Sequence, residues 1–110
     1  MNVTGENLRT AVINFSASGE NTVIAAPSDG YIAIDHINLL PTTANSITFK
    51  SDTTALSGPY PLAALQPLTL ENAMHNRDGV ITCAKNKAFV ISAGSAVQVG
   101  GFIRYRVVGA

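Results

Sequence analysis

The chain has 110 residues, of which 46% are hydrophobic and only 13% are charged. Seven Lys and Arg residues balance seven Asp and Glu residues, so the formal net charge at pH 7 is zero. This length allows one compact domain and excludes a second, catalytic domain. The neutral balance excludes a phosphate-binding surface, and a low charge favours packing against neighbouring chains. The high hydrophobic content argues against disorder.

Apolar residues occur in short groups between turn-forming residues, and no group keeps a helical spacing over three turns. The chain therefore predicts strands throughout. They are expected at residues 10–16, 21–26, 31–40, 46–51, 68–71, 80–84, 88–92 and 96–108, together with an extended segment at 55–62. Eight or nine short strands with frequent turns are typical of a β-sandwich, a jelly roll or a small barrel. Of these we expect two packed antiparallel sheets, that is, an all-β, antiparallel, jelly-roll-like β-sandwich.

Side-chain alternation predicts which faces of these strands are buried. Within residues 46–51, Ile47 and Phe49 share one face, which we assign to the core. Within residues 31–40, a two-residue period runs without interruption and places five residues on one side, namely Ile32, Ile34, His36, Asn38 and Leu40. Pro41 is expected to end the hydrogen bonding of this strand.

Glycine and cysteine mark further structural positions. Gly100 and Gly101 interrupt the last strand, which predicts a bulge, a bend or a close backbone approach. Residues 76–79 resemble a tight Asp-Gly turn. Cys83 has no partner for an internal disulfide, and its apolar neighbours predict a small core residue.

Two domain-level expectations follow. Residues 10–110 are expected to form a single β-sandwich domain, and residues 1–9 an N-terminal arm, for which an ordinary frayed terminus is the alternative.

No apolar run approaches the roughly 18 residues that span a bilayer, and the first residues lack a signal-peptide pattern. We therefore expect no membrane partner and a protein that is soluble where it is made.

The titratable residues do not form a recognisable catalytic or metal-binding motif. Only His36 and His75 are available as imidazole ligands, whereas a metal site needs three or four converging donors. Asp35 adjoins His36 but is expected on the opposite face of its strand. We therefore expect no metal and no cofactor, with His36 partly buried and His75 in a loop.

The remaining nucleophiles, acids and bases are equally unconvincing as sites. Cys83 and the serines show no nucleophile-elbow pattern. Four acids stand in turns or at strand ends, where carboxylates are simply solvated: Asp29, Asp52, Glu71 and Asp78. The basic residues form only two small groups, at 85–87 and 104–106, too few for nucleic acid. In the second group, Tyr105 is expected to face the core. The chain is thus predicted to be neither an enzyme nor a nucleic-acid-binding protein.

Residues 57–68 form an apolar, nearly uncharged, proline-rich segment. The prolines at 59 and 61 confine its extended part, within residues 55–62, to a sheet edge or a loop. It is therefore either a loop folded over the end of the sandwich or a docking surface whose rigidity lowers the entropic cost of binding.

Several of these elements resemble small virion proteins of tailed bacteriophages. A strand ending in Phe-Lys-Ser at 49–51 precedes a Thr-x-Leu-x-Gly-Pro turn at 54–59. A Val-x-Gly-x-x-x-Tyr strand at 99–105 closes the fold, and Gly-Tyr-Ile-Ala-Ile at 30–34 opens the long strand. The resemblance covers about residues 28–108 and consists of strands and turns, without a catalytic signature.

The resemblance implies a jelly-roll capsid decoration (cement) protein on the outside of the phage head. Such proteins bind the major capsid protein as dimers or trimers and brace neighbouring capsomers. The chain would then be located on the capsid surface of the virion, and in the host bacterial cytoplasm during assembly. We place the candidate interface in the arm and in the proline-rich segment, at Asn2, Val3, Leu8, Pro59, Tyr60, Pro61, Leu65 and Pro67. A tail, fibre or baseplate component and a small carbohydrate-binding module remain alternatives.

Overall fold

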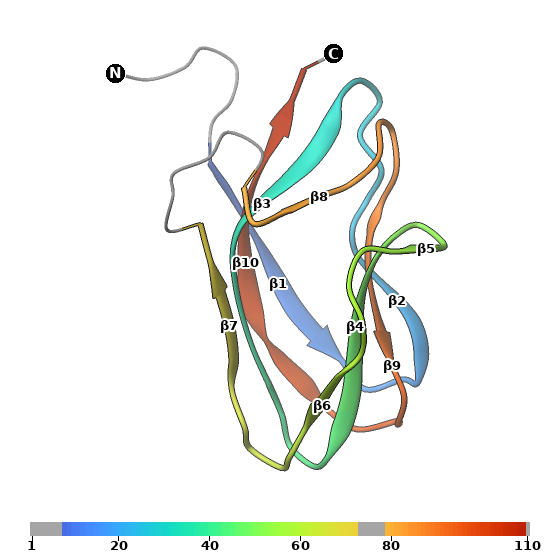
Figure 1. The fold of residues 1–110 in the computed structure, drawn as a ribbon, viewed down its shortest axis with the longest axis vertical. Helices are drawn as coiled ribbons and strands as arrows, with labels where there is room; N and C mark the ends of the chain where they lie inside the picture. The colour runs from blue at the N-terminus through green and yellow to red at the C-terminus, as the bar shows by residue number, and fades with distance from the viewer. Residues whose placement is uncertain (1–7, 73–78, 110) are drawn as a thin grey trace.

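The computed structural model describes residues 8–72 and 79–109, which fold into two antiparallel sheets packed face to face (Figure 1). This part of the chain contains no helix. In chain order the strands are β1 (Arg9–Phe15), β2 (Gly19–Ile24), β3 (Tyr31–Pro41), β4 (Asn45–Ser51), β5 (Thr54–Ala55), β6 (Tyr60–Leu62), β7 (Leu68–Glu71), β8 (Ile81–Thr82), β9 (Phe89–Ala93) and β10 (Val99–Val108). The predicted all-β, antiparallel sandwich is confirmed.

The pairing order is that of a jelly roll. Sheet A has the order β1-β10-β3-β7, and sheet B has the order β2-β9-β4-β5. The two-residue β8 also pairs with β3, and β6 also pairs with β4. The first strand, β1, pairs with the last, β10, and the second strand, β2, pairs with β9. This pairing is typical of a jelly roll, which consists of two Greek keys. The strand count is ten rather than eight or nine because the extended segment at 55–62 is divided into β5 and β6.

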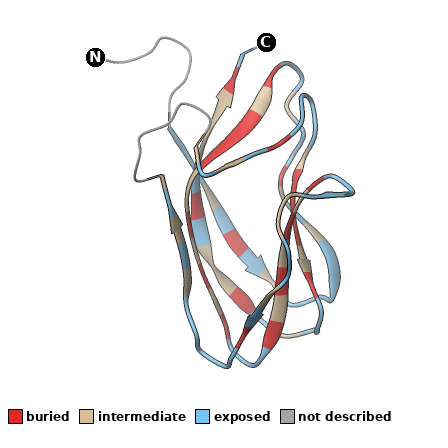
Figure 2. Ribbon diagram, viewed as in Figure 1, coloured by how far each residue is buried: buried red, intermediate tan, exposed pale blue. Residues whose placement is uncertain are grey.

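The hydrophobic core fills the space between the sheets, where buried residues alternate with more exposed ones along the strands (Figure 2). Ile47 and Phe49 are fully buried, which confirms the predicted inward face of β4. The ring of Phe49 stacks on that of Phe89 from the neighbouring β9, with centroids 5.9 Å apart. Cys83 is buried against the same cluster, and this prediction is also confirmed.

The uninterrupted alternation predicted for β3 is wrong. Ile34 pairs with Tyr105 and His36 pairs with Arg104, so Asp35 is an extra residue opposite β10. This bulge moves the following residues to the other face. Ile32 and Ile34 are buried in the first half of the strand, whereas Ile37 and Leu39 are buried in the second half. His36, Asn38 and Leu40 are therefore on the outer face, opposite to Ile32 and Ile34.

Several predicted boundaries also shift by a few residues. β2 begins and ends two residues earlier than expected, β8 is shorter, and β10 begins at Val99. β3 includes Pro41, whose carbonyl accepts a hydrogen bond from the Leu65 N–H at 2.9 Å. β6 lies at the edge of sheet B, as its prolines predicted. The predicted turn at 76–79 lies mostly outside the described residues.

Gly101 is required by a close backbone approach, which confirms one of the readings of the paired glycines. A Cβ atom at this position would lie 1.9 Å from the carbonyl oxygen of Asn38 on β3. Because a backbone atom cannot yield as a flexible side chain can, no larger residue fits without moving the strand. The β10–β3 pair, the centre of sheet A, therefore depends on this glycine.

Candidate interaction surfaces

The outer face of sheet A carries apolar and charged side chains in two adjacent cross-strand rows. In one row, Val12 of β1 pairs with Phe102 of β10, which pairs with Asn38 of β3. Val12 is 71% exposed and Phe102 is 37% exposed. In the other row, Arg104 and Glu71 flank His36, from β10 and β7 respectively. Residues paired across an antiparallel sheet share a face, so both rows project away from sheet B.

An open depression of about 380 Å³ lies on this face. Its lining consists of Leu8, Asp35, His36, Glu71, Asn72, Phe102 and Arg104. The half-buried His36 ring stacks on that of Phe102, with centroids 5.4 Å apart and the planes 22° from parallel. The stack confirms that His36 is a partly buried histidine with a packing partner.

The charged groups around the depression differ in whether they form hydrogen bonds or ion pairs with other described residues. The Asp35 carboxylate, placed there by the bulge, accepts a hydrogen bond from the Asn72 side chain at 2.9 Å and contacts Arg106 at 3.4 Å. Arg104 and Glu71 are exposed, and neither forms an ion pair with another described residue. Their charges are thus available to a partner.

The proline-rich segment forms a second surface at the edge and end of sheet B. Tyr60 packs inward against Phe49, with ring centroids 5.7 Å apart, while Pro59, Pro61 and Pro67 are exposed. Leu65 is 64% exposed and has a φ of +58°. A bulky side chain in this left-handed region is unusual and costs about 1–2 kcal/mol.

Hydrogen bonds hold the Leu65 turn in this shape. Ala63 donates to the Gln66 side chain at 2.7 Å, and the Gln66 N–H donates to the Ala63 carbonyl at 3.1 Å. The Leu65 N–H is bonded to Pro41 at the end of β3. The neighbouring connections are joined by the buried Asn45, whose side-chain oxygen accepts hydrogen bonds from the N–H groups of both Ser46 and Ser95 at 2.9 Å. The Leu65 side chain is therefore held at an end of the sandwich where hydrogen bonds join the neighbouring connections.

The structure divides the predicted interface between two places. Asn2 and Val3 lie outside the described residues. Leu8 precedes β1 and lines the depression on sheet A, whereas the proline-rich segment lies at the opposite end of the long axis (Figure 1). Val12 and Phe102 were missed as surface residues. The available signal was the adjacency of Val12 and Ile13, because two consecutive strand residues cannot both face the core.

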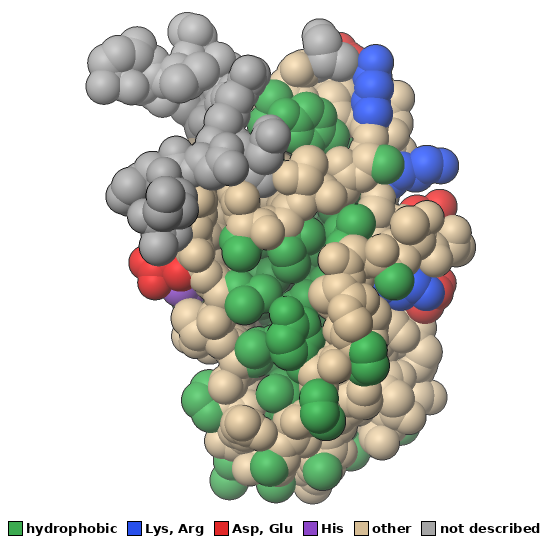
Figure 3. All heavy atoms as spheres, in the orientation of Figure 1, with side chains coloured by type: hydrophobic (Ala, Val, Ile, Leu, Met, Phe, Trp, Pro, Cys, Tyr) green, Lys and Arg blue, Asp and Glu red, His purple; other side chains and the backbone are tan. Residues whose placement is uncertain are grey.

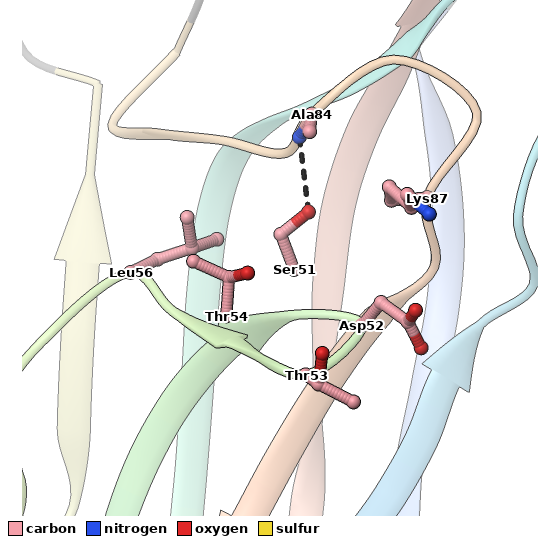
Figure 4. Close-up of a pocket in the computed structure, with 7 residues that line it drawn as sticks. All are labelled: Ser51, Asp52, Thr53, Thr54, Leu56, Ala84 and Lys87. Atoms are coloured by element: carbon pink, nitrogen blue, oxygen red, sulfur yellow. Dashed lines mark hydrogen bonds between the residues drawn. The ribbon is translucent and has the colours of Figure 1, made fainter.

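A smaller pocket of about 180 Å³ lies between the β4–β5 turn and the loop that precedes β9 (Figure 4). Its lining includes Ser51, Asp52 and Lys87. The Ser51 hydroxyl points at the Ala84 N–H and accepts its hydrogen bond at 3.0 Å, so it is engaged in joining the two loops. The volume is below the range of about 300–1,000 Å³ that small-molecule sites occupy. We therefore interpret this pocket as a contact between two loops and not as a ligand site.

A third apolar region follows the opening between the two sheets. Figure 3 shows hydrophobic side chains along the side of the molecule between β7 and the β4–β6 pair. The half-buried residues that pack against the core from these elements are Leu56, Tyr60, Leu68, Leu70 and Ile81. Because they pack against the core, they help to cover it at this side of the sandwich.

The described titratable groups provide little for catalysis. Within residues 8–72 and 79–109, no three His, Cys, Asp or Glu side chains gather as metal ligands would. Burial raises the pKa of the Cys83 thiol from 9.0 to about 11, against a smaller lowering by a hydrogen bond with Ser51. Such a thiol is almost entirely protonated at neutral pH and is a poor nucleophile. His75 and Asp78 lie outside the described residues.

The aromatic and basic residues are also placed by the fold. Tyr105 packs against the core, as predicted, and Tyr31 and Tyr60 are half-buried. No tyrosine therefore offers the exposed platform that a sugar ring requires. Lys85 and Lys87 are exposed on the loop before β9, whereas the exposed Arg104 is on the outer face of sheet A.

Comparison with known proteins found no matching family model, curated protein or solved structure. In the part of the chain that the structure describes, no helix has the length and apolar character needed to cross a membrane.

Proposed function

We propose that this chain is a structural, non-catalytic protein of a bacteriophage particle, a decoration protein that binds the outside of the head and braces neighbouring capsomers. The proposal combines the resemblance of the strand and turn motifs with one structural observation. That observation is Leu65, an exposed apolar side chain held in a strained backbone conformation at a braced end of the sandwich.

The strained backbone at Leu65 costs stability, so we expect this residue to have a function that explains why it is retained. Asn or Gly would adopt the left-handed conformation at lower cost, and a polar residue would suit an exposed turn better than leucine. Backbone strain that the surrounding structure maintains is concentrated at functional positions. The prolines at 59, 61 and 67 further restrict the segment, so little conformational entropy is lost when it docks.

The role follows from these features. The proline-rich segment, with Leu65 at its tip, binds the major capsid protein, and the sandwich transmits load between the sites that copies of this chain occupy. The function is mechanical and requires no cofactor, metal, nucleic acid or membrane. Jelly rolls occur in viral capsid proteins, lectins and cupins, so the fold is compatible with this role but does not specify it.

The test is binding to purified expanded heads that lack this chain, measured by co-sedimentation. Leu65→Asn removes the apolar contact and relieves the strain, so it should lower head binding at least tenfold while raising the free energy of unfolding by about 1 kcal/mol. Leu65→Met is the matched control and should bind as the wild type does, because it retains an apolar side chain of similar size.

Equal head binding by Leu65→Asn and the wild type would contradict the docking role of this loop. A count of copies per particle by quantitative mass spectrometry tests the wider proposal. A simple ratio to the major capsid protein supports shell-wide decoration. A handful of copies would instead support a tail, fibre or baseplate component.

A further inference from the structure

We infer that the outer face of sheet A is the surface through which two copies of this chain pack as a twofold dimer. The inference deepens the proposed decoration role, on which it rests for its biological meaning, because it assigns a partner to the face that the capsid-docking loop leaves free. The two cross-strand rows on β1, β10, β3 and β7 carry it.

The outer face of sheet A exposes apolar side chains on a sheet. Val12, Phe102 and Leu8 are 71%, 37% and 43% exposed, and two of them are on regular strands at the centre and edge of the sheet. β10 is paired on both sides and β1 on one side, so the backbones of Phe102 and Val12 are held in the sheet before any partner arrives. Burying such side chains against another protein is favourable in proportion to the apolar area removed from water.

The charges on this face complement each other under a twofold rotation. Arg104 on β10 and Glu71 on β7 lie in one row on either side of His36, which is on β3. A twofold axis that runs along β3 between two facing sheets places β10 of one copy over β7 of the other. Arg104 of each copy then faces Glu71 of its partner, and two ion pairs form from residues that have none within the described chain.

This pairing also favours a second copy over other occupants. A membrane surface or nucleic acid would select for cations alone, whereas this row contains one cation and one anion. A sugar would require an exposed ring face, but Phe102 is stacked on His36. The open depression beside Phe102 provides room for side chains from a facing sheet.

The experiment is sedimentation equilibrium of the full chain at low ionic strength, without capsids. The wild type should be dimeric in the micromolar range. Arg104→Glu and Glu71→Arg should each weaken the dimer at least tenfold, because each substitution creates like-charge contacts on both sides of the twofold axis. The Arg104→Glu/Glu71→Arg double variant restores opposite charges and should recover most of the wild-type affinity.

Two controls separate this interface from other effects. Lys50→Glu is the same kind of charge change on the outer face of sheet B and should leave the dimer intact. Val12→Ser should weaken the dimer, and the charge variants should not rescue it. Thermal unfolding of each variant checks the fold, because a variant that folds as the wild type does should have a similar melting temperature.

A wild type that stays monomeric throughout the micromolar range would overturn the inference, since the dimer that it predicts would then not form. A double variant no tighter than the single variants would overturn it as well. Either result leaves the proposed function standing, because head binding is tested separately through Leu65. Conversely, Leu65→Asn should dimerise as the wild type does, even where it fails to bind heads.

Discussion

The outer faces of the two sheets are built differently although both sheets contribute to one core. On sheet B, Glu20 of β2, Ser92 of β9 and Thr48 of β4 form a cross-strand row of polar residues. Glu20 also pairs with Lys50 from the next row, so these two charges are neutralised within the molecule. On sheet A, the corresponding rows expose Val12 and Phe102 and leave Arg104 without an ion-pair partner among the described residues.

The difference shows which residues of a small all-β protein can determine what it binds. Inward-facing residues of both sheets must be apolar, so they distinguish little between functions. Outward-facing residues are free of that requirement. The outer face of sheet B is polar and internally paired, whereas that of sheet A exposes apolar side chains and, among the described residues, charges of both signs without an ion-pair partner. Sheet A is therefore the face on which substitutions should change association rather than folding.

The largest expected effect comes from the core that both faces share. Phe49→Ala should lower the free energy of unfolding by about 3–5 kcal/mol, because it removes a fully buried ring that stacks on Phe89 and leaves a cavity. Chemical denaturation followed by circular dichroism measures this loss. A loss below about 1 kcal/mol would mean that the assigned inward face of β4 is wrong.

A second effect depends on pH and on the contact between the two sheets at Cys83. The thiol has a pKa of about 11 in the folded chain and 9.0 when burial is removed. Its contribution to stability is complete below pH 9 and is lost as the pH rises toward 11, because only the unfolded state ionises in that window. The expected loss is about 2–3 kcal/mol.

The comparison for this pH effect is Cys83→Ala, which has no thiol to ionise. Denaturation curves at intervals from pH 8 to 11 should show a steeper decline for the wild type than for the variant, although Lys and Tyr titration affects both. Parallel declines would show that the thiol is not desolvated in the folded chain.

The smallest expected effect is on sheet B and sharpens the contrast between the two outer faces. Lys50→Met removes the ion pair with Glu20 while keeping an unbranched stem of similar length. Because such partly exposed pairs contribute little, the free energy of unfolding should fall by only about 0.2–1 kcal/mol. Self-association should be unchanged. A clear loss of dimer in this variant, measured by sedimentation, would remove the distinction between the faces.

The local patterns in the sequence were sufficient to predict most of the strands. Alternation identified Ile47 and Phe49 as core, and the prolines at 59 and 61 placed their segment at an edge. The β3 bulge could not be predicted in this way. Its cause is the register between Ile34–Tyr105 and His36–Arg104, which joins residues about 70 positions apart. A local pattern contains no information about which residue stands opposite.

The candidate surfaces were predictable to different degrees. The proline-rich segment stood out by composition, and its exposure at Leu65 was within reach of sequence reasoning. Its left-handed backbone was not, because the hydrogen bond from Leu65 to Pro41 depends on where β3 ends. The face of sheet A was not predicted, since Arg104 and Glu71 meet in one row only through their shared neighbour His36.

Short alternating strands and frequent turns were enough to predict an all-β fold of the sandwich or barrel type from the local sequence alone. Which outward-facing residues lie together depends instead on how the strands pair. Strand pairing in a jelly roll joins the first strand to the last and the second to the one before it. Neighbours on a face are thus set by long-range backbone hydrogen bonds, whereas the local pattern specifies only which side of each strand is apolar.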